Sequence, residues 1–260
     1  MNNGLSAEHC FRLAVVSTPR SGNTWLRILL GDLYELEHFA VHTPDDLEWN
    51  NLPNRCILQL HWLRTHDFIK RLERYGFRVV TIARHPLDVL LSILHFSAHA
   101  PQTAFWLGGL GGTEESIINK LPTSQQFLNY ALSRRFRNLL SVSCDWWGCS
   151  DWMIRYEDLV ALPESTLFEI TQKLGQPVKI IRDVVACHTL AALKSTVTNE
   201  HFWQGRPGLW EQVIPDSFIV KIYEQYRNIF RTLQYEVKPK GNLPELCDQR
   251  WKQFTGMAAT

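Results

Sequence analysis

The eight residues from Thr18 to Trp25, TPRSGNTW, constrain the fold of this chain more than any other stretch. The apolar run at 13–16 before them is typical of a short buried strand, and the leucines after them recur at the spacing of one helix face. They are therefore predicted to form a tight turn from a strand into a helix. The first amides of such a helix are unpaired and lie at the positive end of its dipole, so the turn favours an anion. The alternative is an ordinary turn in which Ser21 or Asn23 caps the helix.

A second basic turn is predicted after the clearest strand of the sequence, at 78–83. This strand ends at Arg84, and Pro86 stands where the first turn of a helix begins. In an open parallel sheet, the carboxyl ends of the strands share one edge, where ligands bind. Arg20 and Arg84 are therefore expected to hold a ligand with two anionic groups on one nucleotide.

The rest of the chain alternates strand and helix patterns, which predicts an α/β fold with helices flanking a parallel sheet. We interpret residues 1–260 as a single domain with loosely patterned termini at 1–10 and about 240–260, because no repeat or linker divides it. Further strands are predicted at 56–60 and 152–156, and helices at 67–75, 121–140, 163–174, 178–194 and 215–233. Residues 35–55 are predicted to form a surface loop or short helices, and loops are predicted at 95–115 and after 236.

The composition is that of a globular protein, with 45% hydrophobic and 20% charged residues. A formal net charge of +1 argues against a nucleic-acid partner bound by bulk electrostatics. The six cysteines form no C-x-x-C pair, which favours reduced thiols and a cytoplasmic location over a disulfide or zinc framework. The start of the chain has no long apolar run, so neither a signal peptide nor a membrane span is predicted.

A P-loop kinase is one alternative for the first turn. That class needs G-x-x-x-x-G-K-[ST] and a carboxylate at the end of a neighbouring strand to hold Mg²⁺. Here the first turn has no Gly-Lys pair, and the neighbouring strand ends in Arg84 instead of an aspartate, while Asp88 is expected to serve the first turn of its own helix. These features favour a metal-independent anionic ligand. His95 and His99 have the helical spacing of a metal pair, but the sequence places no third ligand, so no metal site is predicted.

The turn from Thr18 to Trp25 resembles the 5′-phosphosulfate loop of the cytosolic-type sulfotransferases, in the form common in bacterial members. The segment from Arg84 to Ser92 resembles the 3′-phosphate segment of the same family, an arginine with a serine eight residues later. Weaker similarities follow in family order at 155–159 and 205–210. The resemblance implies a P-loop-like sulfotransferase fold. It also implies transfer of a sulfuryl group from 3′-phosphoadenosine-5′-phosphosulfate (PAPS), leaving 3′-phosphoadenosine-5′-phosphate (PAP), to a hydroxyl or, as the less favoured choice, an amine.

The resemblance also implies a role for each matching residue. Arg20 takes the place of the family's loop lysine, which holds the 5′-phosphate and meets charge on the bridging oxygen. Arg84 and Ser92 would bind the 3′-phosphate, and His61 would be the general base that takes the acceptor's proton. Trp25 would lie against the adenine, and the remaining nucleotide contacts would come from Ser21, Gly22, Asn23, Thr24, Tyr156, Gly205 and Arg206.

Two departures from the family pattern stand out. The family's lysine two residues before the base is Gln59 here, and Trp203 stands where an arginine for the 3′-phosphate belongs, with Arg206 as a substitute. These departures leave open a non-catalytic nucleotide-binding relative. The acceptor is expected to be a small molecule, carbohydrate or lipid in a pocket built from residues 36–55, 61–66 and 95–115, where an aromatic, glycine-rich loop forms a lid. The oligomeric state is not predicted.

Overall fold

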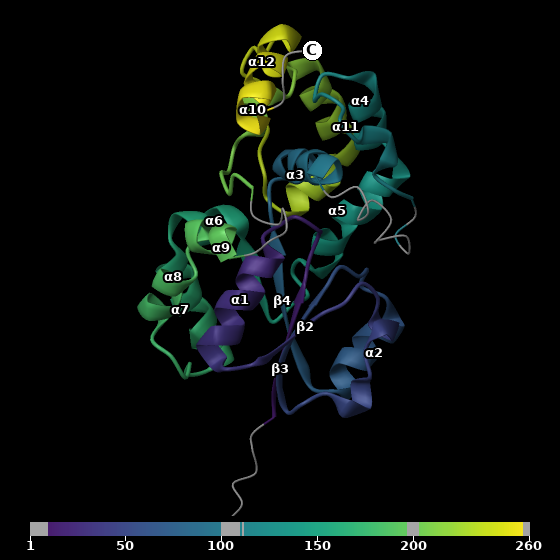
Figure 1. The fold of residues 1–260 in the computed structure, drawn as a ribbon. Coiled ribbons are helices and arrows are strands. Elements are labelled where there is room, and N and C mark those ends of the chain that lie inside the picture. The colour runs from purple at the N-terminus through teal and green to yellow at the C-terminus, as the bar shows by residue number, and fades with distance from the viewer. Residues whose placement is uncertain (1–9, 100–109, 111, 197–202, 257–260) are drawn as a thin grey trace, which may run out of the picture.

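A computed structural model describes residues 10–99, 110, 112–196 and 203–256 (Figure 1). Its centre is a parallel sheet in the order β2-β3-β1-β4-β5, in which Val16 lies beside Leu60 and Ala83 beside Arg155. The five strands are β1 (Phe11–Val16), β2 (Glu37–Ala40), β3 (Arg55–Leu60), β4 (Phe77–Ala83) and β5 (Trp152–Arg155). The α/β fold expected from the sequence is therefore confirmed.

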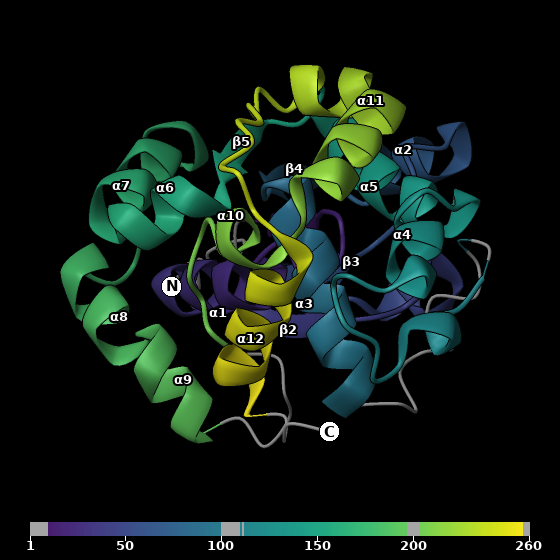
Figure 2. The same ribbon diagram turned by 90° about the horizontal axis from the view of Figure 1, so that it is seen from above.

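Helices cover both faces of the sheet (Figures 1 and 2). One face packs against α1 (Asn23–Tyr34), α6 (Tyr156–Ala161), α7 (Pro163–Leu174), α8 (Ile181–Cys187) and α9 (Leu190–Thr196). The other packs against α2 (His66–Arg74), α3 (Pro86–His99), α4 (Gln125–Ala131), α5 (Arg134–Trp146), α10 (Trp210–Val213), α11 (Asp216–Thr232) and α12 (Pro244–Thr255). Short 3-10 turns lie at 44–46, 49–51 and 115–117.

Each face has its own apolar core, because side chains of a strand alternate between the two sides. Leu13 and Val15 of β1 pack with the leucines of α1, whereas Ala14 and Val16 pack into the core beneath α3 and α5. All four are fully buried. A central strand covered on both faces reads as a continuous apolar run, which is how β1 and β4 were visible in the sequence.

Three predicted segments differ from the structure in their internal division. The loop predicted at 35–55 contains β2, an edge strand whose mostly exposed side chains give no apolar alternation. The helix predicted at 121–140 is two helices, α4 and α5. Ser133 is the N-cap of α5, because its hydroxyl accepts a hydrogen bond from the amide of Phe136. The helix predicted at 178–194 is also two, separated at His188 and Thr189.

Three further boundaries were wrong. The strand predicted to 156 ends at Arg155, and Tyr156 begins α6. The tail after 236 contains α12, which buries Cys247 and Trp251 on one face. The loop predicted from 95 begins later, because α3 continues through His99; residues 100–109 and 111 of that loop lie outside the described residues.

One serine of α5 ties together the carboxyl ends of two central strands. Ser143 Oγ accepts the amide of Thr18 at 2.7 Å and donates to the carbonyl of Ile82 at 2.9 Å. The hydroxyl of Thr18 donates in turn to the carbonyl of Leu139 at 2.9 Å. The turns that follow β1 and β4 are therefore held in fixed positions. Across the described ranges, the structure has no helix with the length and apolar character that crossing a bilayer requires.

Candidate functional site

The turn after β1 has the conformation of an anion-binding loop. Arg20 and Gly22 have left-handed backbone angles, with φ of 66° and 93°. Gly22 is the N-cap of α1 and has no side chain that could occupy the first amides of the helix. A Cβ at Gly22 would also lie 2.4 Å from Cδ2 of Tyr156. Only glycine fits here, and the alternative of a helix capped by Ser21 or Asn23 does not describe this turn.

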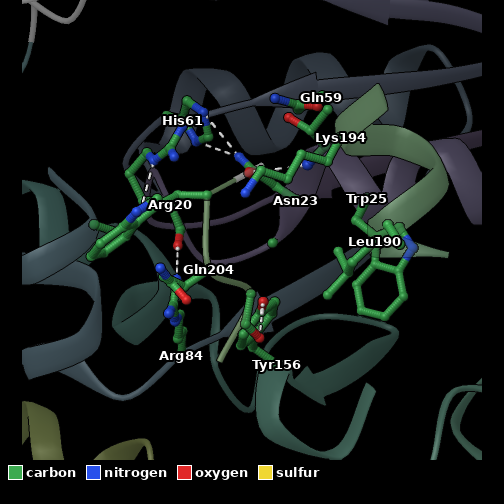
Figure 3. A pocket seen from close by; sticks show the side chains of 16 residues that line it. Arg20, Asn23, Trp25, Gln59, His61, Arg84, Tyr156, Leu190, Lys194 and Gln204 are labelled. Atoms are coloured by element: carbon green, nitrogen blue, oxygen red, sulfur yellow. Dashed lines mark hydrogen bonds between the residues drawn. The ribbon is translucent and has the colours of Figure 1, made fainter. Parts of the chain in front are cut away.

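The two arginines predicted to meet at the sheet edge do so (Figure 3). Nη1 of Arg84 donates to the carbonyl of Arg20 at 3.3 Å, and Nε of Arg20 donates to Ser92 Oγ at 3.1 Å. Each guanidinium also lies over an aromatic ring, that of Arg20 over Phe96 at 4.2 Å and that of Arg84 over Tyr156 at 4.5 Å. Among the described residues, the buried Nε of Arg84 has no hydrogen-bond partner. The donor set therefore suits an anion at each arginine.

A cavity of about 300 Å³ opens between these turns and α9. Most of the predicted site residues line it: Arg20, Gly22, Asn23, Thr24, Trp25, His61, Arg84, Ser92, Tyr156 and Gly205. The Ser21 side chain is buried outside the lining, and its hydroxyl has no partner among the described residues. Arg206 is exposed and does not line the cavity. The predicted site residues therefore lie around one cavity, except that Ser21 and Arg206 do not line it.

His61 lies at the end of β3, on the wall of the cavity and 4% exposed. Its Nδ1 lies 2.8 Å from the carbonyl of Ser17, which fixes the proton on Nδ1 and the lone pair on Nε2. The Asn23 amide nitrogen is 3.0 Å from Nε2 and 3.1 Å from Nδ1. Nearly equal distances to both nitrogens place this amide over the ring, because an amide in line with one lone pair would be far from the other nitrogen. Ser17 and Asn23 therefore orient the imidazole.

The opposite wall of the cavity was predicted only at Gly205. It comes from α9 and the segment after it, through Leu190, Ala191, Lys194, Gln204 and Gly205. The first three share one helix face, since Leu190 and Ala191 lie four and three positions before Lys194, and these spacings bring side chains together on a helix. This spacing is visible in the sequence, but it looks like that of any amphipathic turn, so it carried no signal for a site.

Two hydrogen bonds attach this opposite wall to the rest of the site. The indole Nε1 of Trp25 donates to the carbonyl of His188 at 2.8 Å, just before α9 begins. The Tyr156 hydroxyl donates to the carbonyl of Gly205 at 2.9 Å. Gly205 has a φ of 65°, and a Cβ there would lie 2.7 Å from Cδ1 of Leu190. Trp25 and Tyr156 therefore hold the cover of the cavity as well as lining it.

Trp203 lies where the family pattern has an arginine. Its ring lines the cavity and stacks on His95 at 4.0 Å, and its edge meets Trp251 at 5.5 Å. His95 also stacks on His99 at 4.0 Å. Burial lowers the pKa of His95 to about 3, and the nearby charges of His99, Arg20 and Lys194 add to this shift. This end of the site is thus an aromatic wall whose histidine is neutral at physiological pH.

Asp88 does not act as expected. It stands in the first turn of α3, but its carboxylate accepts the amides of Gly208 at 2.7 Å and Trp210 at 3.2 Å. Burial raises the pKa of this carboxyl, while Arg84 and the bound amides oppose the rise. Asp88 therefore fixes the segment that carries Gly205 instead of its own helix. Among the described residues, no group of three or more His, Cys, Asp or Glu side chains is placed to hold a metal ion.

The region 36–55, expected in the acceptor pocket, contributes no residue to this cavity. Residues 45–51 line a separate groove together with α2, where the guanidinium of Arg71 lies over the Trp49 ring at 5.6 Å. Of the other expected segments, 61–66 contributes His61 to the cavity. Next to it the cavity is lined by Gln59, Ser92 and Trp203. This side of the cavity therefore comes from the end of β3, the middle of α3 and the segment after α9.

The family follows from comparison with known proteins. The sulfotransferase domain family matches residues 12–233, so the chain belongs to this family. The enzyme class expected from the sequence, a PAPS-dependent sulfotransferase, is thereby confirmed at the level of the family. No curated protein sequence matches the chain.

Solved structures with the same fold share little sequence with the chain. The mouse sulfotransferase SULT7A1 in complex with PAP is 16% identical, with a TM-score of 0.61 over 87% of this chain and 89% of its own. Retinol dehydratase in complex with androsterone and the inactive cofactor PAP is 12% identical, with a TM-score of 0.56 over 88% and 83%. The complex of retinol dehydratase with retinol and PAP gives 12% identity and a TM-score of 0.54 over 89% and 84%. At such identities the likeness establishes the fold.

Proposed function

We propose that this protein transfers a sulfuryl group from PAPS to the hydroxyl of a small molecule, with His61 as the general base. The observation that carries the proposal is the convergence of Arg20, Arg84 and His61 on one cavity. A doubly phosphorylated adenosine needs anion sites at two separated points, and the two arginine turns supply them. His61 lines the same cavity and supplies the proton acceptor.

The residues present fit the nucleotide. The amides at the start of α1, of which that of Thr24 donates to Oδ1 of Asn23 at 3.1 Å, suit the 5′-phosphosulfate together with the side chains of Arg20 and Thr24. Arg84 has a buried Nε with no partner in the described structure, and Ser92 lies beside Arg20, so these two residues suit the 3′-phosphate. Trp25 and Leu190 both line the cavity and offer apolar surface for adenine.

Bound PAPS supplies the sulfuryl group, whose sulfur the acceptor oxygen attacks. His61 takes the acceptor's proton on Nε2 while its Nδ1 proton stays with Ser17, so the ring keeps its orientation as it becomes charged. Arg20 meets the negative charge that appears on the bridging oxygen. Its planar fork is held by Ser92 and Phe96, so it provides a more fixed charge than a lysine at this position would.

The acceptor proposed is a flat or ring-bearing small-molecule hydroxyl. Support comes from the aromatic wall of Trp203 and His95 beside the cavity. Retinol and androsterone, bound in the retinol dehydratase structures, are small hydroxyl compounds of this kind. A carbohydrate hydroxyl remains the second choice.

The test is transfer of ³⁵S from labelled PAPS across a panel of phenols, sterols, retinoids and sugars. We expect His61→Ala to lower kcat by about 1000-fold while PAP binding, followed by tryptophan fluorescence, stays within about twofold. His66→Ala, an exposed histidine at the start of α2, is the matched control and should leave both unchanged.

Three results would contradict the proposal. Failure of the wild type to bind PAP would remove the nucleotide site. Binding of PAP without transfer to any acceptor would assign the chain as a non-catalytic relative, which Gln59 and Trp203 favour. Unchanged turnover in His61→Ala would leave the fold intact and remove the base.

A further inference from the structure

The cavity is unevenly charged. Arg20 and Arg84 lie together beside Ser92 and Tyr156, whereas the wall around His61 presents the neutral side chains of Gln59 and Asn23. The side-chain amide oxygen of Gln59, Oε1, accepts a hydrogen bond from Nε of Arg27 at 3.0 Å. Arg27 itself does not line the cavity, and its Nη1 contacts His38 at 2.9 Å. The wall nearest the proposed base therefore presents an amide where a cation would be useful to a transferring sulfuryl group.

A cation approaches this wall from the other side. Lys194 extends from α9 into the same space as Gln59 and Asn23 (Figure 3). Its position follows from the helix: Leu193 is buried in the core shared with α1, so the neighbouring face, with Leu190 and Lys194, turns toward the cavity. The Trp25 to His188 hydrogen bond fixes the start of this helix.

In the described part of the chain, no acidic side chain forms an ion pair with Lys194. Its side chain is exposed at the mouth of the cavity. An exposed lysine is most often a solubilising residue that faces bulk water. This one instead lines a concave site that already holds two arginines, and like charges gathered around one cavity repel each other unless an anion lies between them.

We infer that Lys194 contacts the sulfonate oxygens of bound PAPS and supplies the cation that Gln59 does not. This inference rests on the proposed function. In the transfer, the acceptor oxygen forms a bond to sulfur as the bond from sulfur to the bridging oxygen breaks. The proton goes to His61, and the electron pair of the broken bond stays on the phosphate of PAP. Lys194 balances the negative charge of the sulfuryl oxygens on the side of the cavity opposite Arg20.

The test compares Lys194→Ala, Lys194→Arg and the double variant Gln59→Lys with Lys194→Ala. We expect Lys194→Ala to lower kcat by about 100-fold and to leave the affinity for PAP, which lacks the sulfuryl group, within about twofold. Lys194→Arg should retain most of the rate. The double variant should have a kcat at least about tenfold higher than that of Lys194→Ala alone, because Gln59→Lys returns a cation to the facing wall. Lys221→Ala, an exposed lysine of α11, is the control.

A merely structural role for Lys194 gives different results. Unchanged kcat in Lys194→Ala, or equal losses of PAPS and PAP affinity, would overturn the inference. So would a double variant as slow as Lys194→Ala. If the wild type proves to transfer nothing, the ratio of PAPS to PAP dissociation constants without acceptor decides. Loss of a preference for PAPS in Lys194→Ala then supports the contact, and an unchanged ratio overturns it.

Discussion

The two walls of the cavity are built in different ways. The strand-end wall, made of Arg20, Asn23, His61, Arg84 and Ser92, follows β1, β3 and β4, and most of its side chains are buried and hydrogen-bonded to one another. The covering wall, made of Leu190, Ala191, Lys194, Gln204 and Gly205, is largely exposed. Trp25 and Tyr156 bond to backbone carbonyls on or beside it. The strand-end wall is therefore the more rigid of the two, and the covering wall is the looser one.

The largest expected effect is on the strand-end wall. Gly22→Ala forces a side chain into a left-handed conformation and against the Tyr156 ring, 2.4 Å away, which backbone on both sides holds in place. We expect the free energy of unfolding to fall by about 3 kcal/mol and PAP affinity to fall by more than about 100-fold. Urea denaturation and fluorescence titration measure the two.

Gly205→Ala makes the matched change on the covering wall. Its Cβ would meet the end of the Leu190 side chain, which can turn away. We therefore expect the free energy of unfolding to fall by about 1 kcal/mol and PAP affinity to fall by less than about tenfold. Equal effects at the two glycines would contradict the division into a rigid and a looser wall.

The second-largest effect concerns His85, the buried residue that follows Arg84 of the strand-end wall. Burial lowers the pKa of His85 to about 4, below the value of about 6.5 expected in the unfolded chain. Folding therefore favours the neutral ring. This stabilisation is complete above about pH 6.5 and is lost as the pH falls from there toward 4. Between pH 7 and 4.5 we expect unfolding to become easier by about 2 kcal/mol.

His85→Phe keeps the ring that stacks on Trp210 at 4.5 Å but cannot titrate. This variant should be less stable at pH 7, because it leaves the carbonyl of Glu236 without its partner, and its stability should depend less on pH in this range. His95, with a pKa of about 3, contributes in the same direction and remains in both proteins. An unchanged pH dependence in the variant would mean that folding does not lower the pKa of His85.

The smallest effects separate the covering wall from the exposed segment next to it. Tyr156→Phe removes only the hydrogen bond to the Gly205 carbonyl and keeps the ring beside Gly22 and Arg84. PAP affinity should fall about fivefold, the equivalent of about 1 kcal/mol. Arg206→Ala, outside the cavity, should change it by less than about twofold, as titration calorimetry can show. A larger effect at Arg206 would mean that it substitutes for the arginine missing at Trp203.

The strand-end wall was largely predictable because its signals are local. An apolar run, a turn with a required glycine and a helix face lie within about twenty residues around Gly22. Around Arg84 the local signals are an apolar run and a helix that begins at Pro86. The topology rule for parallel sheets then brings the two turns together without any contact information. His61 needed the family resemblance, because a histidine after an apolar run has no periodic signal of its own.

The covering wall, apart from Gly205, was not predictable because its signals are long-range. Lys194 faces the cavity through the burial of Leu193 against α1 and the bond from Trp25 to His188, 163 residues away in the sequence. The role of Asp88 likewise depends on amides 120 and 122 residues further along. The edge strand β2 was missed for a different reason, because its side chains are exposed and lack a core pattern.

Ser143 has a consequence for how the protein is made. The motif from Thr18 to Trp25 precedes α5 in the chain and so leaves the ribosome before it, and the hydroxyl that ties its strand to β4 arrives 125 residues later. A nascent chain that ends before Ser143 contains the whole motif without the clamp that holds its geometry. Since distant contacts form late in folding, nucleotide affinity should appear only when α5 has been synthesised and docked.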